Sequence, residues 1–122
     1  MDKEPIDNES FKEPFGDKAA QKALDFLRTQ AKAAGLAKAR VIEMEAFIKI
    51  TKSELTKRSQ AKSVAAQEIE ALCQPEYKNA VELYANAVAE QEELFWKRVA
   101  AEATIEAWRT HSSNQRGEKR MV

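Results

Sequence analysis

The sequence has few of the residues that build turns and reactive sites. Among its 122 residues there are three glycines, three prolines, one cysteine and one histidine, and aromatic residues make up only 7%. So few turn-forming residues disfavour a fold of many short strands. The lone Cys73 excludes an intramolecular disulfide, and one cysteine with one histidine cannot fill a structural zinc site.

The residues needed for catalysis are equally scarce. His111 is the only histidine, and it lies at a predicted helix end, whereas a preorganised catalytic site needs rigid surroundings. Glu90, Glu92 and Glu93 form the densest carboxylate group, but the chain lacks the Glu-x-x-His pair of two-metal helical bundles and any glycine-rich phosphate loop. We therefore expect no enzyme activity, no catalytic residue, no cofactor, no metal and no small-molecule substrate.

Long apolar runs are also absent. No stretch approaches the roughly 18 apolar residues of a membrane span, and the acidic start of the sequence does not resemble a signal peptide. These absences predict a cytoplasmic protein without a membrane partner.

The abundant residues are those of long helices. Ala, Glu, Lys, Gln and Leu are frequent, and charged residues make up 33% of the chain. With so few aromatic residues, the core has to come from small apolar side chains along extended seams. Such seams usually need a second chain to bury both sides, so the composition predicts a homo-oligomer.

The order of these residues predicts an all-α domain over 17–111. Residues 1–16 are acidic and poor in apolar groups, which is typical of a flexible arm. Asp17 can cap a first, shorter helix over 17–34 that ends at Gly35. Two long helices are expected over 36–73 and 75–111, separated at Pro75, and a flexible basic tail over 112–122.

Charge predicts how the two long helices pair. Residues 18–65 carry eleven basic and four acidic side chains, whereas residues 66–106 carry three basic and nine acidic ones. Opposite charge favours an antiparallel, coiled-coil-like hairpin that turns at Pro75 over the alternative of one kinked rod. In such a hairpin we expect Arg58 or Lys62 to contact the segment 90–92.

Apolar spacing locates the seams of the two long helices. In the first of them a heptad-like seam falters at Arg58 and Lys62, which would be core positions. The second has a stripe that Gln91, Arg98 and Glu102 interrupt. The seam of the first comprises Val41, Met44, Ile48, Thr51 and Leu55; that of the second comprises Tyr77, Val81, Tyr84, Val88, Phe95 and Ile105, flanked by Ala80, Ala87, Leu94, Ala101 and Trp108.

Two sets of residues are candidates for binding. Exposed tryptophan and arginine are typical of protein interfaces, and we predict partner contacts at Trp96, Arg98, Trp108 and Arg109. Trp108 also fits the apolar stripe, whereas Trp96 lies off it and is the better candidate for an exposed anchor. Basic side chains can neutralise phosphates, although few aromatic residues lie among them to stack on bases. The candidate nucleic-acid contacts are Lys49, Lys52, Lys57, Arg58, Lys62, Arg116, Lys119 and Arg120.

The C-terminal half also carries a family resemblance. It rests on Pro75-Glu76-Tyr77, on Glu92-Glu93-Leu94-Phe95-Trp96, and on Ile105-Glu106-Ala107-Trp108-Arg109-Thr110 with Ser113-Asn114-Gln115-Arg116. Over about residues 70–116, and more weakly over 36–70, the chain resembles small all-α proteins of temperate phages and prophages. These proteins look like products of early-region gene clusters that also encode DNA-annealing or recombination functions.

The resemblance implies no catalytic residue, and it implies an accessory role in phage DNA recombination or replication. Together with the residues above, it predicts a phage or prophage interaction protein that acts by binding a protein partner of a DNA-metabolism complex. One alternative is direct DNA binding by the basic surface of an oligomer. Another is an architectural coiled-coil subunit or an inhibitor of a host protein.

Overall fold

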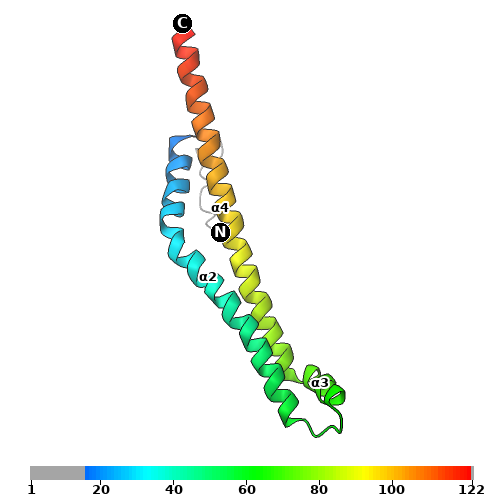
Figure 1. Cartoon of the computed structure of the whole chain (residues 1–122). Coiled ribbons are helices and arrows are strands. Elements are labelled where there is room, and N and C mark those ends of the chain that lie inside the picture. Colours follow the sequence, from blue (N-terminus) through cyan, green and yellow to red (C-terminus); the bar gives the residue numbers. More distant parts are fainter. Residues whose placement is uncertain (1–15, 122) are drawn as a thin grey trace, which may run out of the picture. The chain divides into compact units, whose positions relative to one another are not determined.

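The structure is a computed structural model, and it describes residues 16–121. Three α-helices make up the regular structure of this range: α2 (Asp17–Arg58), α3 (Val64–Leu72) and α4 (Pro75–Met121) (Figure 1). The predicted all-α fold is therefore confirmed. The predicted arm over 1–16 lies outside the described residues, apart from Gly16.

Helix α2 runs without interruption through Gly35, so the predicted end of a helix at 34 is wrong. A glycine stop needs a positive φ, and no described glycine has one. The helix continues because buried and half-buried side chains recur every seven residues, in the same register before and after Gly35. These buried or half-buried residues are Ala20, Leu27, Ala34, Val41, Ile48 and Leu55 on one line, and Ala23, Gln30, Ala37, Met44 and Thr51 on the next.

The predicted helix over 36–73 is divided, because α2 ends at Arg58 and α3 begins at Val64. The break falls where the repeat would place Arg58 and Lys62 in the core, so continuing the helix would bury two charges. Ser63 caps the new helix, since its hydroxyl accepts a hydrogen bond from the backbone N–H of Ala66 at 3.1 Å.

Side chains hold the segment between α2 and α3 in place. The hydroxyl of Ser59 donates to Oε2 of Glu70 at 2.8 Å, and Nε2 of Gln67 donates to the carbonyl of Ala61 at 3.0 Å. The sequence predicts a different contact for this part of the chain, between Arg58 or Lys62 and the segment 90–92. The described residues contain no ion pair of Arg58 or Lys62 with that segment. Arg58 is the last residue of α2, and Lys62 lies in the connection to α3.

Helix α4 begins at Pro75, where the sequence predicts the last helix, but it continues past 111 to Met121. The segment 112–114 contains Ser and Asn, which cost only a few tenths of a kcal/mol each in a helix, and no proline follows. The residues predicted to form a tail outside the domain are therefore helical as far as Met121.

The contacts of the chain divide it into two units. In the described range, the first unit joins α2 up to Ala31 with α4 from Phe95 onward, and the second unit spans Lys32–Leu94. In the first unit the indole N–H of Trp108 donates to Oδ1 of Asp17 at 2.6 Å, which fixes the start of α2 against α4. The second unit holds the rest of α2, all of α3 and the start of α4.

Small side chains form most of the core of both units. The buried apolar residues are six alanines and Leu55, accompanied by Gln30 and Thr51. In α4 the buried positions are Ala80, Ala87 and Ala101, which the sequence analysis placed beside the seam, whereas Val81 and Phe95 of the expected seam are exposed. Alanine allows helices to approach closely, so the tight line of contact follows the alanines and leaves larger side chains outside it.

Candidate interaction surface

The most exposed aromatic side chain of the described residues lies on α4. Trp96 is 62% exposed, and its ring meets that of Phe95 edge to face, with centroids 5.3 Å apart and planes at 83°. The guanidinium carbon of Arg98 lies 5.2 Å from the centre of the Phe95 ring. We call Phe95, Trp96 and Arg98 the aromatic cluster; all three belong to the first unit.

The contacts within the aromatic cluster restrict its side chains before any partner arrives. An edge-to-face pair contributes about 0.5–1.5 kcal/mol beyond its buried area, and an exposed cation over a ring about 0.5–1 kcal/mol. Nε of Arg98 also lies 4.0 Å from Oε1 of Glu102, one turn further along α4. A Trp and an Arg held in this way lose less rotamer freedom on binding, which favours their use as interface anchors.

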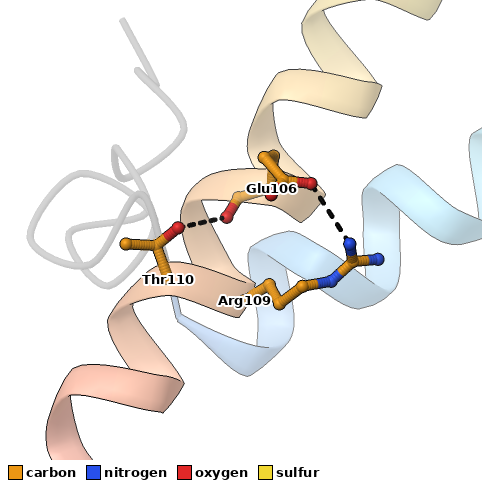
Figure 2. A network of polar contacts seen from close by, with 3 residues as sticks. All are labelled: Glu106, Arg109 and Thr110. Carbon is orange, nitrogen blue, oxygen red and sulfur yellow. Dashed lines mark hydrogen bonds and ion pairs between the residues drawn. The ribbon is translucent and has the colours of Figure 1, made fainter.

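The other two predicted partner residues have different surroundings. Trp108 is half-buried and donates its indole N–H to Asp17, so its polar atom already holds α2 against α4. Arg109 is exposed, and its Nη1 lies 3.3 Å from Oε2 of Glu106 (Figure 2). The Thr110 hydroxyl donates to the carbonyl of Glu106 at 3.1 Å, as Figure 2 also shows.

The structure therefore does not join the four predicted residues into one site. Trp96 and Arg98 meet through Phe95, which the sequence analysis assigned to the helix seam and missed as a surface residue. A seven-residue repeat drawn through the alanines of α4 would have placed Phe95 outside the core.

A groove lies in the first unit between α2 and α4. Its volume is about 480 Å³, and four of its eight lining residues are alanines, with a phenylalanine, a threonine and one lysine from each helix. No carboxylate, histidine or cysteine lines it, so its polar groups are two lysine ammonium groups and one threonine hydroxyl. The lining residues are Ala19, Lys22, Ala23, Phe26, Lys97, Ala100, Ala101 and Thr104.

The predicted nucleic-acid contacts fall into two groups in different units. Arg116, Lys119 and Arg120 are exposed near the end of α4. The other five lie in the second unit, where Lys52 is half-buried and Lys49, Lys57, Arg58 and Lys62 are exposed. Four of the eight occupy last turns, Lys57 and Arg58 in α2 and Lys119 and Arg120 in α4, where a positive charge complements the helix dipole.

The remaining reactive residues stand apart from one another. Cys73 is a free thiol in an exposed position after α3, and His111 is exposed on α4. Residues 16–121 contain no group of three His, Cys, Asp or Glu side chains that could hold a metal ion. No helix in that range is long and apolar enough to cross a lipid bilayer.

Comparison of the chain with models of protein families, with curated proteins and with solved structures finds no match. The resemblance to phage and prophage proteins stays a prediction from the residues quoted for it.

Proposed function

We propose that the chain is a non-catalytic helical interaction protein whose aromatic cluster binds a protein partner. In this proposal α2 and α4 form an antiparallel, coiled-coil-like hairpin that serves as a rigid support. The observation that carries the proposal is Trp96, which is 62% exposed while Phe95 and Arg98 hold the surface around it in place. The phage resemblance adds the process, which would be DNA recombination or replication.

The chemistry of the aromatic cluster defines the partner that fits it. An indole offers a large apolar surface and one N–H donor, so its complement is an apolar pocket with an acceptor at the edge. Arg98 next to it favours a carboxylate at the rim of that pocket, since a guanidinium binds carboxylates well. We therefore infer a folded protein partner that has an apolar pocket with acidic residues around it.

Trp96→Ala is expected to weaken the complex with the partner at least about tenfold, because truncating a central tryptophan typically costs 2 kcal/mol or more. A photo-crosslinking residue at exposed position 92, one turn before Trp96, identifies the partner in host extract, and titration of the purified pair by calorimetry then measures the affinity. Val64→Ala, which shortens an exposed apolar side chain in the other unit, is the matched control and should bind like the unaltered chain. Equal affinity of the Trp96→Ala variant would refute the proposal.

Direct DNA binding is the second candidate, and the exposed basic residues at the end of α4 favour it. Neutralising Arg116, Lys119 and Arg120 together with Gln should reduce the slope of log affinity against log salt by about 2–3, since each phosphate contact contributes roughly 0.7–0.9. Titrations of single- and double-stranded DNA at two salt concentrations measure it. Absence of any salt-dependent complex at micromolar protein removes this candidate.

A further inference from the structure

Helix α2 has a second apolar surface besides the buried seam. In the second unit Leu36 is 61% exposed, Ile50 55% and Phe47 39%. Leu36, Phe47 and Ile50 follow one another at intervals of 11 and 3 residues, so they share one side of the helix. Exposed Ala39 and Ala46 lie on the same side, so the three larger apolar side chains project beyond the neighbouring alanines.

Charged residues border this surface in a symmetric pattern. Arg40, Phe47 and Glu54 are each seven residues apart, so they form one line along α2, with a positive charge one heptad before the phenylalanine and a negative charge one heptad after it. Arg40 and Glu54 are exposed, and the structure gives neither an ion-pair partner among the described residues. Each heptad advances about 10.5 Å along the axis.

We propose that this surface of α2 is the interface with a second copy of the same chain, arranged antiparallel about a two-fold axis at Phe47. In that arrangement Phe47 stacks on the partner copy's phenylalanine at the axis. Arg40 of each copy faces Glu54 of the other, because the two residues lie equally far from the axis in opposite directions. One surface thereby supplies both halves of two ion pairs.

The self-complementary charge pattern selects a second copy over other occupants. In a two-fold interface one surface has to supply both members of each charge pair, and the line Arg40–Phe47–Glu54 read backwards meets this requirement. An unrelated helical partner would need no such symmetry. Leu36, Glu43 and Ile50 are seven residues apart, so Glu43 lies within this surface, and in the proposed arrangement it lies beside Ile50 of the other copy. Its methylene groups can contact that isoleucine while the carboxylate extends to water. The inference does not depend on the aromatic cluster, which lies in the other unit.

Charge reversal tests the interface. Analytical ultracentrifugation of the full chain at low salt should show a concentration-dependent dimer, which Arg40→Glu or Glu54→Arg weakens roughly tenfold because two ion pairs become two like-charge contacts. The double variant, Arg40→Glu with Glu54→Arg, should restore dimerisation, since the charges are exchanged. Lys49→Glu and Glu45→Arg are matched controls, each nine residues from its counterpart and therefore on the opposite side of α2, and should leave the dimer unchanged.

A disulfide test locates the two-fold axis. In a Cys73→Ser background, Phe47→Cys should oxidise to a covalent dimer, because residues on the axis meet their own copies, whereas exposed Lys38→Cys on the opposite side should not. Circular dichroism shows that each variant keeps its helices. A chain that stays monomeric throughout the micromolar range, single reversals without effect, a double variant no tighter than the single ones, or equal oxidation at 38 and 47 each overturns the proposal.

Discussion

A Gly35→Pro substitution is expected to lower the free energy of unfolding by about 3 kcal/mol or more, because position 35 lies in the interior of α2. Proline would remove the hydrogen bond from the N–H of residue 35 to the carbonyl of Ala31. Its ring would also clash with that carbonyl and disfavour the helical conformation of Ala34. Urea denaturation followed by circular dichroism measures the loss.

Alanine at the same position is the control, and it should have the opposite sign. Gly35 has a negative φ, and a Cβ built there meets no atom within 4 Å, so Gly35→Ala should raise the free energy of unfolding by about 0.4–1 kcal/mol. If a helix instead ended at Gly35 in a left-handed conformation, alanine would destabilise the protein. A loss of stability on Gly35→Ala would therefore contradict the continuous helix.

Ala80→Leu is expected to lower the free energy of unfolding by about 1–3 kcal/mol. Ala80 is 0% exposed and shares one heptad line of α4 with the buried Ala87 and Ala101. A leucine there adds a branched side chain to a filled space, so the neighbouring helices must separate or the side chain must leave its preferred rotamers. Chemical denaturation compared with the unaltered chain measures the effect.

Ala85→Leu provides the matched control, since it makes the same chemical change on the same helix. Ala85 is exposed, and leucine is nearly as good a helix former as alanine, so stability should change by less than about 0.5 kcal/mol. Equal losses at positions 80 and 85 would show that the alanine line of α4 is not the packed side.

Residue spacing was sufficient to predict the helical class and the start of the last helix at Pro75, but three features were wrong: the helix end at 34, the unbroken helix over 36–73 and the helix end at 111. Gly35 by itself indicates a helix end, but Ala34 and Val41 share one phase of the repeat across the glycine. A favourable seam over many turns outweighs a local cost of about 1 kcal/mol. The same repeat also indicates where α2 ends, because it places a charged residue at a core position at Arg58, the last residue of α2.

The candidate site was partly predictable for a similar reason. Trp96 was expected to be exposed because it falls outside the apolar stripe, and the structure places it there. Phe95 and Trp108 were harder to assign, because hydrophobicity alone does not tell which of two adjacent lines faces the partner helix. The small residues distinguish the two lines: Ala87 and Ala101 are buried, Phe95 on the neighbouring line is exposed, and Trp108 on the alanine line is half-buried.

The small size of the buried side chains has a consequence for how the molecule can vary. No large side chain is fully buried in the described residues, so no single layer dominates the attraction between helices. Each heptad of small buried side chains contributes a modest amount to the free energy of helix packing. The stability of the packed helices therefore depends on the length of their contact and not on one large buried side chain. Exposed positions can change in sequence without altering that contact.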